Sequence, residues 1–129
     1  MMSEHTEVST MHIGAVAERT GLSLRTLRHW DEVGLVQPSG RSDGGFRLYT
    51  EDDVERILLV RRMKPLGFTL AEMGELLEVA DRIAGGAADA AARSRLAELL
   101  ASAQQRRAEL AGKLDMADEF IAKLRALTA

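Results

Sequence analysis

Residues 13–34 carry apolar side chains every three or four positions, in two short runs. The first run stops at Gly21, a residue suited to the left-handed position after a helix, and Ser23 is a good N-cap for the second. This spacing places inward the residues Ile13, Val16, Ala17, Leu24, Leu27, Trp30 and Val33. Two short helices joined by a tight glycine-containing turn predict a helix-turn-helix.

Residues 35–50 have a different pattern, because Pro38 and several glycines interrupt them. Short apolar runs at residues 35–36 and 46–49 flank a turn at residues 43–44. This arrangement predicts a small two-stranded hairpin, or wing, next to the helix-turn-helix.

Two further helices follow the wing. Thr50 is a predicted N-cap, and Pro65 ends the helix that begins there. Thr69 and Glu72 have the spacing of a capping box, which predicts the start of a fourth helix with Met73 and Leu77 inward.

Residues 91–127 contain no proline and have a heptad-like apolar seam, interrupted by Arg107. A helix of about 35 residues is roughly 50 Å long. It cannot bury such a seam against one small domain, so we expect a homodimer. The expected dimerisation residues are Leu96, Leu100, Leu110, Leu114, Ile121 and Leu124.

The predicted fold is therefore mainly α-helical: a winged helix-turn-helix domain with a small β-hairpin wing, followed by a long dimerisation helix. We expect four segments along the chain: a flexible N-terminal tail at 1–11, the winged helix-turn-helix domain at 12–82, a hinge at 83–90 and the coiled-coil helix at 91–129.

Composition narrows the function of this 129-residue chain. It has no cysteine, which excludes disulfides and thiolate metal sites and is consistent with a cytoplasmic protein. No apolar run is long enough for a membrane span, so no membrane partner is expected. The three histidines are scattered and the methionines at 63, 73 and 116 lie on or beside core stripes, so we expect no metal and no cofactor. No catalytic constellation is present, and we expect no enzyme.

The formal net charge is −3, yet residues 12–50 hold five arginines against four acids. The outer face of the second predicted helix carries Arg25, Thr26, Arg28 and His29. Arginine can donate two hydrogen bonds to guanine, and threonine can contact a base edge or methyl group. This face is therefore the candidate contact with double-stranded DNA.

Four blocks of the sequence resemble MerR-type transcription regulators. They are residues 13–21 (IGAVAERTG), 23–35 (SLRTLRHWDEVGL), 45–49 (GFRLY) and 66–70 (LGFTL) with Glu72. The resemblance implies a homodimer joined by an antiparallel coiled coil, which binds an inverted repeat in promoter DNA. It also implies that the protein bends and untwists the promoter spacer, so that RNA polymerase can engage both promoter elements.

The resemblance also implies roles for individual residues. Arg25 and Thr26 match positions that face the major groove, and Ser23, the cap of the same helix, is a further expected DNA-binding residue. His29 stands where the family usually has a phosphate-contacting tyrosine, and Arg28 matches an arginine with either a DNA-contacting or a structural role. The wing positions that match backbone contacts are Arg41, Arg47 and Tyr49.

The sequence leaves a second function open. An architectural DNA-binding protein, similar to an excision factor or a nucleoid protein, would use the same helix-turn-helix without sensing an effector. Such proteins usually lack the long dimerisation helix. For a regulator without cysteines, we expect any effector to be a small organic molecule, bound between the fourth helix, residues 85–86 and the partner's dimerisation helix.

Overall fold

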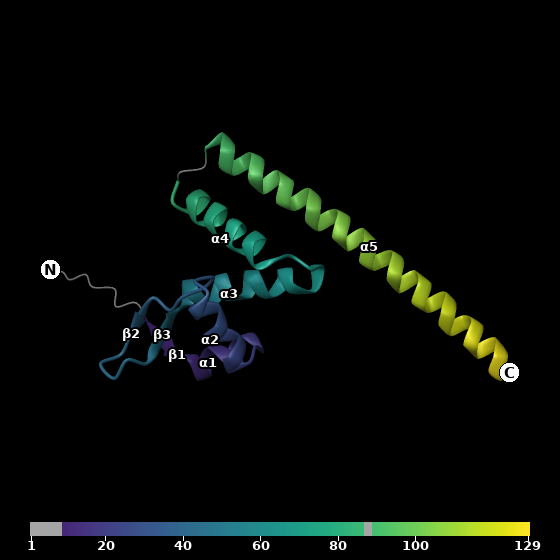
Figure 1. Ribbon diagram of the computed structural model, residues 1–129, viewed down its shortest axis with the longest axis horizontal. Coiled ribbons are helices and arrows are strands. Elements are labelled where there is room, and N and C mark those ends of the chain that lie inside the picture. Colours follow the sequence, from purple (N-terminus) through teal and green to yellow (C-terminus); the bar gives the residue numbers. More distant parts are fainter. Residues whose placement is uncertain (1–8, 87–88) are drawn as a thin grey trace. The chain divides into compact units, whose positions relative to one another are not determined.

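The computed structural model describes residues 9–86 and 89–129 (Figure 1). The chain divides into two compact units, one ending at Met63 and the other beginning at Lys64. This boundary differs from the one expected after residue 82. The reason is that helix α4 (Leu70–Ala84) packs along helix α5 (Ala90–Thr128) and so belongs to the second unit.

The first unit combines three helices with a three-stranded antiparallel sheet. In chain order its elements are β1 (Thr10–His12), α1 (Ile13–Thr20), α2 (Leu24–Glu32), β2 (Gly40–Arg41), β3 (Arg47–Thr50) and α3 (Glu51–Met63). The strand order is β1-β3-β2, so β3 is central. The predicted helix-turn-helix is α1 and α2, and the wing is the β2–β3 hairpin.

Strand β1 corrects the expected N-terminal tail. Met11 pairs with Tyr49 across the β1–β3 ladder, so the ordered domain begins before residue 12. Residues 1–8 of the expected tail at 1–11 lie outside the described residues. The wing also differs from its prediction, because residues 35–36 form no strand and their side chains are buried instead. The strand that pairs with β3 on this side is β2.

The periodicity of α2 predicts burial correctly in the middle of the helix but not at its ends. Leu27 and Trp30 are buried, as expected. Leu24 and Val33, at the two ends of the helix, are 39% and 49% exposed, so their predicted burial is wrong. Leu24 is the first residue of the nine-residue helix and Val33 is its C-cap, so both lie away from the core that covers the middle of the helix.

Capping residues fix the helix starts that position the wing. Gly21 adopts φ +70°, which permits the sharp turn between α1 and α2. Thr50 and Asp53 cap α3 reciprocally: the Asp53 N–H donates to Thr50 Oγ1, and the Thr50 N–H donates to Asp53 Oδ2. The Ser39 N–H also donates to Asp53 Oδ2, at 3.0 Å. The buried Asp53 carboxylate therefore ties the start of the wing to α3.

The second unit consists of the 3-10 turn η1 (Lys64–Leu66), α4 and α5. The predicted capping box is present, with Thr69 and Glu72 bonded in both directions. Arg106 of α5 joins this corner: its guanidinium donates to Glu72 at 3.1 Å and to the Leu66 carbonyl at 3.3 Å. The same group lies 3.9 Å from the centre of the Phe68 ring.

The expected hinge at 83–90 is shorter than predicted. Helix α4 continues to Ala84, and α5 begins at Ala90 with Asp89 as its N-cap. Residues 87–88 lie outside the described residues. No helix in the described ranges has both the length and the apolar character needed to cross a membrane.

Helix α5 is packed along its first part only. Ala92 and Leu99 are buried, whereas every residue from 107 to 129 is exposed. Met63 and Met73 are buried, as their core assignment predicts. Met116 is exposed in this single chain, so its core assignment is wrong here, because α4 ends well short of it.

Candidate nucleic-acid interface

Helix α2 presents a basic, unpaired face opposite its buried side. Leu27 and Trp30 anchor the inner side, and the 3.6-residue period turns Arg25, Arg28 and His29 outward. All three side chains are exposed, and none has a hydrogen-bond or ion-pair partner within the described residues. Their donors are therefore available to an external acceptor such as a base edge or a phosphate.

The start of α2 is organised by Ser23 and Thr26. The Thr26 N–H donates to Ser23 Oγ at 3.0 Å, and the Ser23 hydroxyl donates to Thr26 Oγ1 at 3.0 Å. The Ser23 hydroxyl is thus used within the protein as an N-cap. The Thr26 hydroxyl accepts this bond, which leaves its proton to donate outward.

Both wing arginines bind one aspartate of α2. Arg47 Nε donates to Asp31 Oδ2 at 2.6 Å, and Arg41 Nη2 donates to the same oxygen at 3.2 Å. The hydrogen bond to Asp31 raises the pKa of Arg47. Both arginines therefore have a protein partner, and their contact with the DNA backbone stays a prediction. Asp31 itself is buried.

The tip of the wing is a tight turn closed by backbone bonds. The Ser42 N–H donates to the Phe46 carbonyl and the Gly45 N–H donates to the Ser42 carbonyl, each at 2.8 Å. Arg41 Nη1 donates to the Gly45 carbonyl at 3.4 Å, while Nη2 of the same side chain donates to Asp31. The Arg41 side chain therefore links the turn to α2. Phe46 is 67% exposed beside this turn. Sequence reasoning did not single it out, although an aromatic residue beside two glycines is a visible signal.

Tyr49 is not available to DNA. Its side chain is fully buried under the sheet, so the prediction that it contacts the sugar-phosphate backbone is wrong. The alternation along β3 explains the error, because Tyr49 points to the core face of a central strand. Burial raises the pKa of its phenol. Within the described residues, its hydroxyl has no hydrogen-bond partner.

An exposed ion pair joins α1 to the start of α3. Arg19 Nη1 lies 2.5 Å from Glu51 Oε1. The hydrogen bond from Arg19 lowers the pKa of Glu51. This pair connects α1 with α3. It also neutralises one of the basic side chains of the first unit.

The second unit carries an apolar face that no other described part of the chain covers. The expected dimerisation residues all have exposed side chains: Leu96, Leu100, Leu110, Leu114, Ile121 and Leu124. From Leu110 onward these positions continue the same side of the helix that carries Ala92 and Leu99 against α4, since the spacing of three and four residues is preserved.

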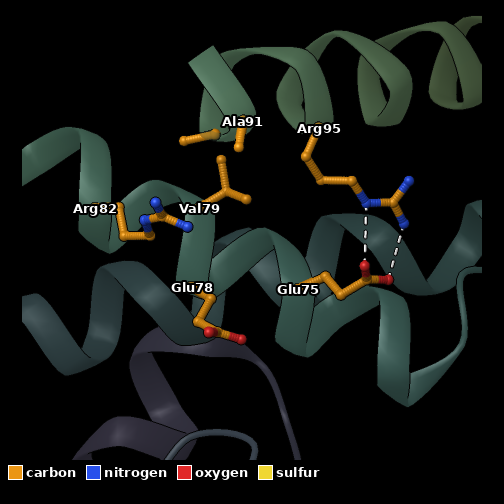
Figure 2. Close-up of a pocket in the computed structure, with 7 residues that line it drawn as sticks. Glu75, Glu78, Val79, Arg82, Ala91 and Arg95 are labelled. Carbon is orange, nitrogen blue, oxygen red and sulfur yellow. Dashed lines mark hydrogen bonds and ion pairs between the residues drawn. The ribbon is translucent and has the colours of Figure 1, made fainter. Parts of the chain in front are cut away.

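A small cavity of about 170 Å³ lies between α4 and α5 (Figure 2). Arg95 crosses one end and pairs with Glu75, with N–O distances of 2.8 and 3.1 Å. Glu78, Val79, Arg82 and Ala91 line the remainder. Arg82 is bonded to Asp89. Within the described residues, no three His, Asp or Glu side chains are grouped as metal ligands.

The chain matches two family models. The MerR HTH family regulatory protein model covers residues 11–79, and the MerR, DNA binding model covers residues 54–127. The mercuric resistance operon regulatory protein of Bacillus cereus is 39% identical over 70 residues, or 54% of this chain and 53% of that protein. The chain spans about half the length of curated relatives such as this one.

Solved structures extend the likeness to the long helix. HiNmlR, a MerR family regulator lacking the sensor domain and bound to promoter DNA, matches with a TM-score of 0.70 and 25% identity. The match covers 90% of this chain and 88% of that one. MtaN, the N-terminus of the Bacillus subtilis multidrug transporter activator, matches with a TM-score of 0.51 and 36% identity, over 83% and 96% of the two chains. With a family model over more than half of its residues, this chain belongs to the MerR family of helix-turn-helix regulatory proteins.

Proposed function

We propose that the protein is a dimeric, sequence-specific regulator that binds an inverted repeat in promoter DNA. The observation that carries the proposal is the unpaired basic face of α2, with Arg25, Arg28 and His29 exposed on a helix whose other side is fixed in the core. Such a face, at the second helix of a helix-turn-helix, is the geometry that enters the major groove. A structural relative lacking a sensor domain is bound to promoter DNA, which supports the same role here.

The expected role of each residue on DNA depends on which of its hydrogen-bond donors are not used within the protein. Arg25 and Thr26 are at the start of α2, where side chains of a recognition helix reach base edges. His29 and Arg28 extend along the same face and suit phosphate contacts. Arg47 binds Asp31 through Nε alone, which leaves its two terminal amino groups for a phosphate.

The dimer is the second part of the proposal. The exposed apolar positions of α5 need a partner, and a second antiparallel α5 presents the same positions in return. Two copies of α2 would then read two half-sites about 34 Å apart on one side of the duplex. We propose that the dimer distorts the promoter spacer and so controls how RNA polymerase engages it, at a bending cost on the order of 1 to 6 kcal/mol.

For the effector, the cavity between α4 and α5 is the candidate within one chain. Three of its four charged side chains have ion-pair partners, Glu75 with Arg95 and Arg82 with Asp89, which disfavours a highly charged ligand. A small organic molecule that reaches Val79 and the unpaired Glu78 would fit best, with the partner's helix completing the site. The architectural alternative is not favoured, because the chain has the long α5 and its relatives are transcription regulators.

The proposal is tested by equilibrium binding to the region upstream of the protein's own coding sequence, against a scrambled duplex of equal length. Wild-type protein should prefer the upstream duplex. Arg25→Ala should lose about 1 to 3 kcal/mol per half-site on that duplex and little on the scrambled one. Arg125→Ala is the matched control, because it removes an exposed arginine from the end of α5.

Arg28→Ala gives the complementary result. It should weaken binding to both duplexes by a similar factor and reduce the dependence of binding on salt, because phosphate contacts release counterions. Equal losses of selectivity in the Arg25 and Arg28 variants would contradict the assigned roles. A wild-type protein that binds both duplexes equally would contradict the function itself.

A further inference from the structure

One carboxylate oxygen of the recognition helix holds both strands of the wing. Asp31 Oδ2 accepts Arg47 Nε from β3 at 2.6 Å and Arg41 Nη2 from β2 at 3.2 Å. The Asp31 side chain is only 8% exposed, so water competes little for these bonds. Helix α2 and both strands of the wing are therefore connected through the buried Asp31 carboxylate.

The two arginines would otherwise oppose each other. Arg41 and Arg47 are directly paired residues in the antiparallel β2–β3 ladder. Like charges at such positions destabilise a strand pair, and β2 is only two residues long. With so few ladder bonds, the hairpin depends on Asp31 to neutralise the repulsion and to hold both guanidinium groups on one side.

We propose that Asp31 is a positioning residue that sets the wing against the recognition helix and thereby contributes to DNA selectivity. The inference rests on the proposed function, since it describes how the two DNA-contacting elements are kept in register. Asp31 does not contact DNA itself. It fixes where the free amino groups of Arg47 and the half-exposed Arg41 meet the backbone, relative to the bases under α2.

The positioning role of Asp31 and its charge alone predict opposite effects of an Asp31→Asn substitution on specific DNA binding. Replacing a carboxylate by an amide makes the protein more positive, and charge alone would tighten binding to any DNA. A misplaced wing instead lowers the affinity for the specific duplex. On that duplex the wing must contact the backbone at a fixed distance from the bases that α2 contacts. The two effects act on different duplexes, so the ratio of the two affinities distinguishes them.

The test compares Asp31→Asn with Asp52→Asn. Both make the same chemical change in the first unit, and Asp52 is exposed with no side-chain partner within the described residues. Affinities are measured for the protein's own upstream duplex and for a scrambled duplex of equal length, after circular dichroism confirms folding. Asp31→Asn should lower the ratio of the two affinities by about tenfold, and Asp52→Asn should leave it at the wild-type value.

A second readout needs no DNA. Hydrogen exchange at the wing-turn amides of Ser42 and Gly45 should be faster in Asp31→Asn than in Asp52→Asn, because the hairpin opens more often. If Asp31→Asn does not fold, Arg47→Lys carries the test. It keeps the charge but lacks the fork that binds Asp31 and phosphate together, so it should lose selectivity in the same way.

The inference is overturned if Asp31→Asn, or Arg47→Lys in its place, keeps the wild-type affinity ratio. Tighter binding of Asp31→Asn to both duplexes by one common factor would also overturn it, in favour of charge balance alone. A wild-type protein without preference for the upstream duplex counts against the proposed function, and the hydrogen-exchange comparison then still decides whether Asp31 holds the wing.

Discussion

Leu114→Asp is expected to separate the dimer into folded monomers. Leu114 is 63% exposed in the single chain and lies in the middle of the proposed seam. Fully burying a leucine side chain is worth about 2 kcal/mol, so the exposed part contributes about 1.3 kcal/mol per chain and about 2.5 kcal/mol per dimer. This loss alone weakens the dimer about 70-fold. Burying two unpaired carboxylates adds several kcal/mol more.

Sedimentation at micromolar concentration measures the effect directly. Wild-type protein should sediment as a dimer, and Leu114→Asp near the 14.1 kDa of one chain. Met116→Asp is the matched control, because Met116 is 68% exposed but lies on another side of the same helix. Circular dichroism should show that both variants keep their helices. The reasoning is refuted if Leu114→Asp remains dimeric, or if Met116→Asp dissociates equally.

Three further predictions follow from particular contacts. Tyr49→Phe should leave DNA affinity unchanged, because the side chain is fully buried; a loss of affinity with unchanged folding would contradict this. Hydrogen bonding at the α4 cap and the nearby Arg106 lower the pKa of Glu72, so wild type should be more stable than Glu72→Gln above the ordinary glutamate pKa. Thermal melts should show that advantage disappear as the pH falls through the lowered pKa, and a constant difference would contradict it. In circular-permutation gel shifts, mobility of the bound upstream duplex should depend on the position of the site, and constant mobility would exclude DNA bending.

Residues close to each helix end in the sequence are enough to predict most helices of the fold. Gly21, Ser23 and the pair Thr69 and Glu72 are adjacent in sequence to the ends that they form, so their roles follow from local chemistry. The long α5 likewise follows from an uninterrupted seam. Strand β1 carries no comparable signal, because three residues are too few to show alternation and its pairing with β3 is made nearly forty residues away.

The errors at the site have a common cause. Asp31 lies four residues after Leu27, on the inner side of α2, and only the folded wing shows that two arginines neutralise its charge there. The resemblance places Tyr49 against DNA, whereas the central position of β3 in the sheet buries its side chain. Both depend on tertiary contacts between segments that the sequence pattern treats separately.

Selection of bound sites from a random pool of duplexes, with the full chain, tests the central claim most directly. The account predicts enrichment of an inverted repeat whose half-sites lie about one helical turn or a small multiple apart. Substituting Arg25 should change the bases preferred within each half-site. Recovery of no preferred sequence, or of a single half-site without its repeat, would contradict a dimer that reads DNA through α2.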